Sequence, residues 1–159
     1  MKALVFNGPR DIRYETFPVP SLETNNSVIL KVERCSICGS DLHMYHGENL
    51  GKASYGGELT PFCVGHEFTG EIVEVGSQVH RFRVGQQVLA SGGAPCGKCK
   101  NCLSGHAQRC LGWTAFGLSG AMNGGQAEFV NVPMADLTLQ PIPEGVTVEQ
   151  SILLTDAMC

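Results

Sequence analysis

The sequence has little charge and no long apolar run, and both absences limit what the protein can bind. Lys, Arg, Asp and Glu together make up 16% of the 159 residues, and the formal net charge is only -4. Proteins that bind nucleic acid usually carry a strongly basic surface, so we expect no nucleic-acid partner. No stretch approaches the roughly 18 consecutive apolar residues that a membrane-spanning helix needs, so we expect no membrane partner.

The N-terminus also lacks the features of a secretory signal. Its short apolar run ends at Asn7, Gly8, Pro9 and Arg10, which is too early for a signal peptide. This absence favours a cytoplasmic location, where thiols stay reduced. The sequence nevertheless contains eight cysteines. In a reducing compartment, that many cysteines indicate metal binding rather than disulfides.

Strong helix signals are scarce, whereas turn residues are abundant. Twenty glycines and eight prolines favour short strands joined by turns. Alternating or apolar stretches predict strands over residues 2–6, 11–17, 28–34, 70–76, 84–90 and 126–132. The stretches 47–61 and 91–125 show little periodicity and are expected to form loops. A short helix is predicted over 40–45, and a capping box of Thr147 and Gln150 predicts another helix near the end of the chain.

Four of the cysteines follow the spacing C-x2-C-x2-C-x7-C: Cys96, Cys99, Cys102 and Cys110. Two-residue gaps let successive thiolates turn inward around one ion, and the longer gap lets the chain return to complete a tetrahedron. Zinc accepts four thiolates without redox chemistry, and this closed shell leaves no open position. Disulfides or free thiols are the alternatives, which the expected compartment and the close spacing disfavour. We therefore predict a structural zinc site.

A second group of residues offers an open metal site. Cys38 follows a predicted strand, and His66 with Glu67 lies in a separate segment. A thiolate, an imidazole and one further protein ligand leave one zinc position free for water or substrate. Taken singly, these residues also have structural explanations, Cys38 as a small buried hydrophobe and His66 as a hydrogen-bonded core histidine.

Polar residues beside Cys38 suit the handling of a proton. Asp41 can orient a ligand imidazole through its other ring nitrogen, or can cap the short helix. Ser40 can take a proton from an alcohol, and His43 can relay that proton outward.

Together, the string C-G-S-D-L-H from Cys38 to His43, the string G-H-E from Gly65 to Glu67 and the four-cysteine motif resemble the zinc-dependent medium-chain dehydrogenase/reductase (alcohol dehydrogenase) family. The similarity runs from Met1 to the last residue. The resemblance implies a GroES-like, partly open β-barrel with short helices and a zinc-binding loop lobe. It also implies that residues 1–159 form a catalytic domain, and an incomplete one.

The resemblance also assigns roles to individual residues. It implies that Cys38 and His66 are ligands of a catalytic zinc, with Glu67 as the carboxylate beside it that joins the coordination shell in some members. A third ligand is expected near the end of the chain, where Asp156 is preferred over Cys159, because the acid follows the apolar run of the last helix directly.

By the same resemblance, three polar residues act around this zinc. Ser40 corresponds to the hydroxyl that receives the alcohol proton, and His43 to the relay beyond it. Asp41 corresponds to the carboxylate that orients His66. Cys35 and Cys63 then have no ligand role and are expected to be buried.

Hydride transfer needs a nicotinamide, and the family binds it on a Rossmann domain with a G-x-G-x-x-G turn. That motif is absent, and the run from Gly117 to Gly120 has the wrong spacing. We therefore expect NAD or NADP to bind on a domain outside this chain. The expected substrate is an alcohol, polyol or aldehyde, with Trp113 and Phe116 as contributors to its pocket, and the full-length protein is expected to be a homodimer or homotetramer. The alternative is a zinc-binding GroES-like module with a structural or interaction role and no catalysis.

Overall fold

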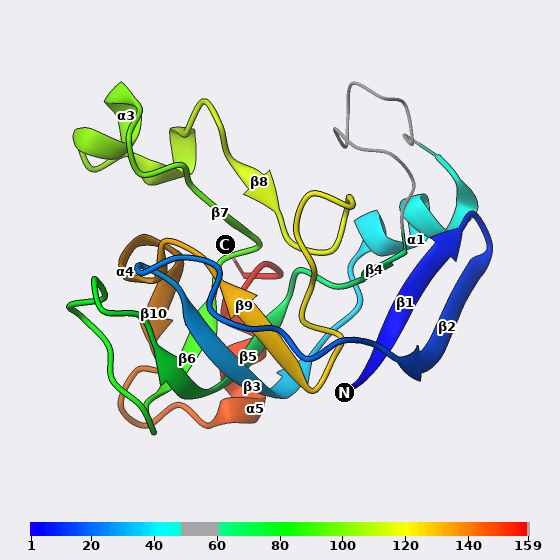
Figure 1. Ribbon diagram of the computed structural model, residues 1–159, viewed down its shortest axis with the longest axis horizontal. Helices are drawn as coiled ribbons and strands as arrows, with labels where there is room; N and C mark the ends of the chain where they lie inside the picture. Colours follow the sequence, from blue (N-terminus) through cyan, green and yellow to red (C-terminus); the bar gives the residue numbers. More distant parts are fainter. Residues whose placement is uncertain (49–60, 159) are drawn as a thin grey trace.

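The computed structural model describes residues 1–48 and 61–158, and its largest element is an antiparallel five-stranded sheet (Figure 1). The spatial order of its strands is β10 (Leu139–Pro141), β6 (Gln87–Ala90), β5 (Phe68–Val75), β3 (Val28–Cys35) and β9 (Phe129–Val132). The long strands β3 and β5 form its centre. The first three residues of each of these strands are buried, and Val28, Leu30, Phe68 and Ile72 belong to the main core.

A second sheet contains the N-terminal strands. Its order is β2 (Asp11–Thr16), β1 (Lys2–Gly8) and β4 (Phe62–Cys63). The segment 124–128 joins it to the rest of the molecule, because Leu4 N–H donates to the carbonyl of Gln126 at 2.8 Å and Gln126 N–H donates to that of Val64 at 2.9 Å. The two sheets remain separate in the described part of the chain. The expected mainly β, partly open GroES-like barrel is confirmed.

The main hydrophobic core lies against the five-stranded sheet. Phe68 and Phe116 are fully buried there and contact each other edge to face, with ring centroids 5.0 Å apart. Val28, Leu30 and Ile72 complete the layer around them. The burial of Phe116 overturns its expected role in a substrate pocket, because its ring is enclosed by core side chains.

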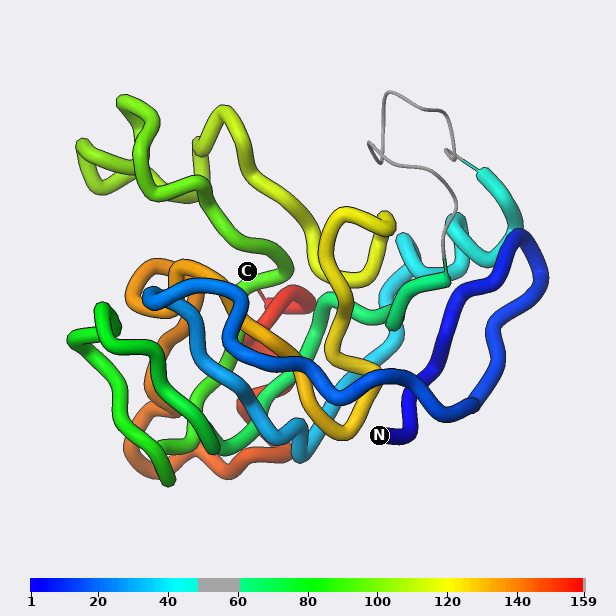
Figure 2. Tube along the Cα trace, viewed as in Figure 1, coloured from blue at the N-terminus to red at the C-terminus, as the bar shows by residue number. Residues whose placement is uncertain are grey.

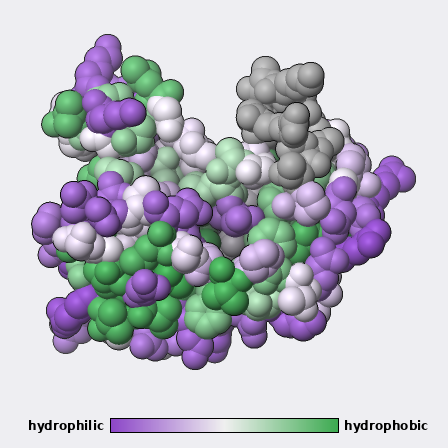
Figure 3. Space-filling view, in the orientation of Figure 1, coloured by the Kyte–Doolittle hydropathy of each residue, from purple (hydrophilic) through white to green (hydrophobic). Residues whose placement is uncertain are grey.

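The four cysteines lie in a lobe that stands away from the central sheet (Figures 1 and 3). The sequence predicts only a loop over 91–125, and this prediction is wrong in detail. The lobe contains the two-stranded pair β7 (Gly93–Ala94) and β8 (Thr114–Ala115), the short helix α3 (Lys100–Leu103) and the 3-10 helix η1 (Ala107–Arg109). Elements of two to four residues are too short to leave a periodic pattern in sequence. Hydrophilic and hydrophobic side chains are mixed on the surface of the lobe (Figure 3).

Among the described residues, three short helices lie outside the lobe, and the longest is α1 (Gly39–His46), as predicted. The others are α4 (Ala135–Thr138) and α5 (Val148–Ser151), which continues as the 3-10 helix η2 (Ile152–Leu154). The predicted capping box of α5 is confirmed, because Thr147 Oγ1 accepts from Gln150 N–H and Gln150 Oε1 accepts from Thr147 N–H. None of the described helices is long and apolar enough to cross a membrane.

The end of the chain packs against segments from its first half (Figure 2). Arg34 at the end of β3 forms an ion pair with Glu149 of α5. This contact brings the residues after α5 beside the residues that follow β3, although more than one hundred residues of sequence separate them.

Some strand limits differ from those predicted. The strand expected over 84–90 begins only at Gln87, because Gly85 has φ +83° and turns the chain. The strand expected over 126–132 begins at Phe129, since residues 126–128 pair with β1 instead. Most of the predicted loop 47–61 lies outside the described residues.

Replacing Phe116 by Ala removes one of the two central rings of the core. We expect the Phe116→Ala protein, saturated with zinc, to lose about 3–5 kcal/mol of unfolding free energy in urea denaturation. Val84→Ala, at a side chain that is 61% exposed, is the control and should change stability little. A loss for Phe116→Ala as small as that of the control would contradict the core described here.

Candidate metal centres

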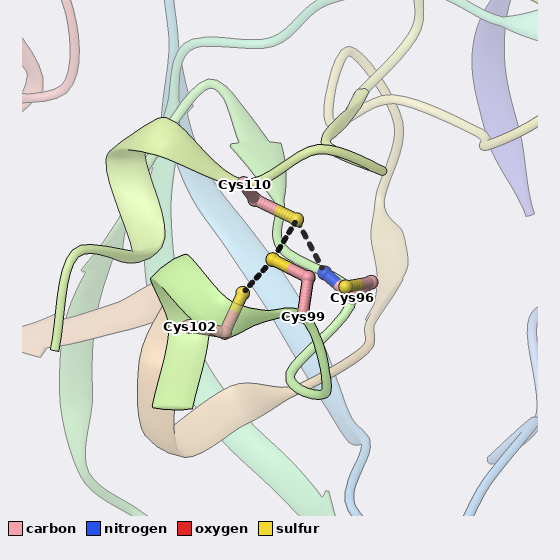
Figure 4. Close-up of side chains that lie close together, drawn as sticks. All are labelled: Cys96, Cys99, Cys102 and Cys110. Atoms are coloured by element: carbon pink, nitrogen blue, oxygen red, sulfur yellow. Dashed lines mark hydrogen bonds between the residues drawn. The ribbon is translucent and has the colours of Figure 1, made fainter. Parts of the chain in front are cut away.

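The four-cysteine cluster closes on one point within the lobe (Figure 4). The four sulfur atoms lie within 4.8 Å of one another. Cys99 Sγ lies 3.5 Å from Cys102 Sγ and 3.9 Å from Cys110 Sγ. Four sulfurs at the Zn–S distance of a tetrahedral site lie about 3.8 Å apart, whereas a disulfide needs about 2.05 Å. The spacing therefore fits a zinc tetrathiolate and excludes disulfides between these pairs.

Backbone groups and burial make the thiols of this cluster unequal. The backbone N–H groups of Cys102 and Leu111 lower the pKa of Cys99 to about 6. Burial, followed by the neighbouring thiols, raises the pKa of Cys102 to about 12. Without metal the cluster therefore holds thiolate and thiol together, and a metal that binds four thiolates must displace the remaining protons.

A second cluster of donors lies where the end of the chain meets the residues after β3. Cys38, His66, Glu67 and Asp156 each offer a ligand atom, and these atoms all lie within 4.8 Å of one another. Cys38 precedes α1, His66 and Glu67 precede β5, and Asp156 follows η2. The structure thus brings together the residues that the sequence places in three separate segments. The alternative ligand Cys159 lies outside the described residues.

The separations in this second cluster also suit zinc. Asp156 Oδ2 lies 3.3 Å from Cys38 Sγ and 3.6 Å from His66 Nε2. For sulfur, nitrogen and oxygen ligands of a tetrahedral zinc, these separations come to about 3.4–3.6 Å. The thiolate, imidazole and carboxylate are the ligand types of catalytic zinc sites. His66 and Glu67 are buried, whereas the side chain of Asp156 is 46% exposed, so the cluster opens to solvent on its Asp156 side.

Asp41 lies between the start of α1 and the ring of His66. One carboxylate oxygen of Asp41 accepts from Cys38 N–H at 2.9 Å, which caps α1. The other faces His66 Nδ1 at 3.5 Å, and both of these buried atoms lack a closer partner among the described residues. Asp41 therefore caps α1 and lies beside the ring of His66, on the side away from the other donors.

The backbone before His66 packs closely against Gln126. Gly65 has φ +94°, and a Cβ at this position would lie 2.4 Å from Cγ of Gln126. Only glycine therefore fits here without displacing Gln126. This close contact between Gly65 and Gln126 sets the backbone direction at His66 and Glu67, which lead into β5.

Ser40 and His43 both lie on α1, Ser40 at the donor cluster and His43 at the surface. Ser40 Oγ is 3.2 Å from His66 Nε2, which places its hydroxyl at the donor cluster. His43 is exposed, and its Nδ1 lies 2.7 Å from Glu48. Glu48 was not singled out in the sequence, where a glutamate near a helix end has no distinguishing pattern.

Ser36 is a further residue of this centre that sequence reasoning missed. Its hydroxyl donates to the Glu67 carboxylate. In the sequence, only its position between Cys35 and Cys38 could have pointed to this contact. Cys63 is buried as expected, but the prediction for Cys35 is wrong, because the fully buried part of β3 ends at Leu30 and the strand then projects beyond the core.

Comparison with known proteins agrees with this fold. The model of the alcohol dehydrogenase GroES-like domain matches residues 24–144. A medium chain reductase/dehydrogenase from Acremonium sp. is 37% identical, covering 98% of this chain and 51% of the relative. Zinc-type alcohol dehydrogenase B from Aspergillus flavus is 38% identical, covering 98% of this chain and 35% of the relative. The solved structure of alcohol dehydrogenase from Thermus sp. ATN1 has a TM-score of 0.86 at 28% identity, covering 98% of this chain and 44% of that one.

The chain belongs to the GroES-like domain family of the alcohol dehydrogenases. Within it, the relatives are zinc-type, medium-chain dehydrogenases, which confirms the resemblance read from the sequence motifs. The chain spans about half or less of the length of these curated relatives.

Removing one cysteine of the lobe should remove one metal ion. We expect Cys102→Ser to bind one zinc per chain fewer than the unchanged protein, because three thiolates and a hydroxyl hold zinc poorly. Metal analysis after dialysis measures the ratio. Cys35→Ser, at an exposed cysteine outside both clusters, is the matched control and should keep the full zinc content. Equal zinc content in both variants would rule out the four-cysteine site.

The charge state of His66 should make metal binding at the second cluster depend on pH. Burial lowers the pKa of His66, but Asp41 and Cys38 together raise it to about 9, compared with an ordinary value of 6.5. In the metal-free protein, protonated His66 therefore stabilises the fold fully below pH 6.5, and this stabilisation is lost as the pH rises through about 9.

Zinc binds only neutral imidazole, so the zinc affinity of this cluster should rise as the pH approaches 9. NMR titration of the metal-free protein measures the pKa of His66 directly. Asp41→Asn should lower that pKa, because the carboxylate that raises it is gone while the burial remains. An unchanged pKa in Asp41→Asn would contradict the assigned pairing.

Proposed function

We propose that this chain is the zinc-binding catalytic domain of an NAD(P)-dependent oxidoreductase that acts on alcohols, polyols or aldehydes. The observation that carries the proposal is the presence of two different donor clusters. The lobe holds four thiols in a closed set, whereas the second cluster combines a thiol, an imidazole and carboxylates and opens to solvent beside Asp156. A closed cluster suits structure, and an open mixed cluster suits catalysis.

Cys38, His66 and Asp156 are the proposed ligands of the catalytic zinc, with Glu67 beside them. The chemistry that zinc supplies in such a site is Lewis-acid polarisation of an alcohol oxygen, which lowers the pKa of the alcohol. Asp41 holds the His66 ring through Nδ1 and so presents Nε2 to the centre. The burial of His66 and Glu67 excludes bulk water from two of the four donors.

Ser40 and His43 are the proposed groups that carry the proton. The Ser40 hydroxyl lies at the donor cluster and receives the proton from the substrate alcohol. His43 is exposed to solvent and passes the proton outward. Because Glu48 engages Nδ1 of His43, the free ring nitrogen Nε2 is the one available to accept a proton.

The nicotinamide is proposed to bind on a separate domain outside this chain, either as NAD or as NADP. The short span of the chain relative to its curated relatives supports that division. We also propose a cytoplasmic protein that works as a homodimer or homotetramer, as the family resemblance implies.

A stand-alone zinc-binding GroES-like module without catalysis is the second candidate. A scaffold needs the four-cysteine lobe but has no use for a buried histidine oriented by a buried aspartate next to a cysteine and a hydroxyl. The second cluster therefore favours the enzyme. The two candidates also differ in metal content, which is two zinc ions per chain for the enzyme and one for the scaffold.

We expect the 159-residue chain alone to bind two zinc ions but to show negligible NAD(P)-linked oxidation of alcohols. A protein extended by a nicotinamide-binding domain should be active, and Ser40→Ala should lower its kcat by about 10²- to 10⁴-fold, since the proton acceptor is lost. Ser40→Thr keeps a hydroxyl and is the control that should retain most activity. A single zinc ion per chain, or full activity of Ser40→Ala, would count against this function.

A further inference from the structure

The catalytic cluster contains one protein donor more than an open zinc site uses. Cys38, His66, Glu67 and Asp156 all offer atoms within 4.8 Å of one another. A tetrahedral zinc that keeps a position for substrate takes three protein ligands. One of the four donors therefore has to stay away from the metal while substrate is bound.

Glu67 is the donor that has a protein partner ready to hold it elsewhere. The hydroxyl of Ser36 donates a hydrogen bond to Glu67 Oε2. Only 6% of Glu67 is exposed, so bulk water does not satisfy this carboxylate. Asp156, by contrast, is 46% exposed on its side chain and is solvated on its outer side. A hydrogen bond to a buried carboxylate is charge-assisted and correspondingly strong.

The position of Ser36 is set by the fold on two sides. Its backbone N–H donates to the carbonyl of Glu67 at 3.2 Å. Its own carbonyl accepts from Nε2 of Gln126 at 3.0 Å. Gln126 is buried, and its backbone pairs with Val64 and Leu4, so it is anchored to both neighbouring segments. Both backbone polar groups of Ser36 are therefore hydrogen-bonded, and these two bonds hold its hydroxyl next to Glu67.

We propose that Ser36 is a positioning residue that holds the Glu67 carboxylate off the metal and so keeps the fourth coordination position open for substrate. This inference rests on the proposed function and adds to it the group that controls Glu67. Without the hydroxyl, the buried carboxylate loses the side-chain donor that the described residues give it and is free to bind the metal. Glu67 then competes with the substrate for the same position.

Cobalt in place of zinc makes this competition measurable without turnover, because its visible absorption changes with ligand number and type. In the full-length protein, imidazole serves as a small probe that binds the open position of the cobalt. We expect Ser36→Ala to weaken imidazole binding on the order of 10- to 100-fold, which matches the loss of a hydrogen bond to a charged group. Ser36→Thr keeps a hydroxyl and should bind imidazole about as tightly as the unchanged protein. Ser77→Ala, at an exposed serine, should leave the imidazole affinity unchanged.

Glu67→Gln separates this role from a general structural one. If Ser36 acts through the carboxylate, adding Ser36→Ala to Glu67→Gln should cause no further loss of imidazole affinity. A loss of the same size in the Glu67→Gln background would overturn the proposal, since Ser36 would then act by another route. Ser36→Gly provides a second variant without the hydroxyl if Ser36→Ala does not fold.

The cobalt spectrum of the unchanged protein distinguishes the two hypotheses. If cobalt enters the Cys38 centre but Ser36→Ala binds imidazole as tightly as the unchanged protein, the inference on Ser36 fails and the proposed function stands. If the protein takes up no metal at this centre, the proposed function and the inference fail together.

Discussion

The backbone pairing around Val64 and Gly65 is the constraint on which both the barrel and the second donor cluster depend. Val64 N–H donates to the carbonyl of Leu4 at 3.0 Å, and the carbonyl of Val64 accepts from Gln126 at 2.9 Å. This stretch is thus paired on both sides, and it has no room for a side chain at Gly65. Since His66 directly follows Gly65, the contacts that join the two sheets also set the positions of the proposed ligand His66 and of Glu67.

The features that could be predicted from the sequence are those that depend on local spacing. The cysteine motif specifies a closed cluster because ligands with only two or seven residues between them converge through tight local turns. The capping box of Thr147 and Gln150 is equally local, and the structure forms both of its hydrogen bonds. The strands with clear alternation, such as β3, were also predictable, whereas their ends were not, because pairing with β1 removes residues 126–128 from β9.

The remaining features depend on tertiary contacts that leave no pattern in a single sequence. Cys35 looks like a core residue beside an apolar strand, but it is exposed because the core ends before the strand does. Phe116 lies in a glycine-rich segment with no periodicity, and its burial follows from tertiary packing in the main core, including its contact with Phe68. Ser36 contacts Glu67 across two segments that are far apart in sequence. The motifs thus identified the donors and Asp41 beside His66, while the contact of Ser36 with Glu67 became visible only in the structure.

The two metal clusters differ in how much chain lies between their members. Cys99 and Cys110 are separated by 11 positions, whereas Cys38 and Asp156 are separated by 118. Closing the shorter loop costs less conformational entropy. All four cysteines of the lobe also precede Asp156 in the sequence, so during synthesis the donors of the lobe are complete before those of the second cluster.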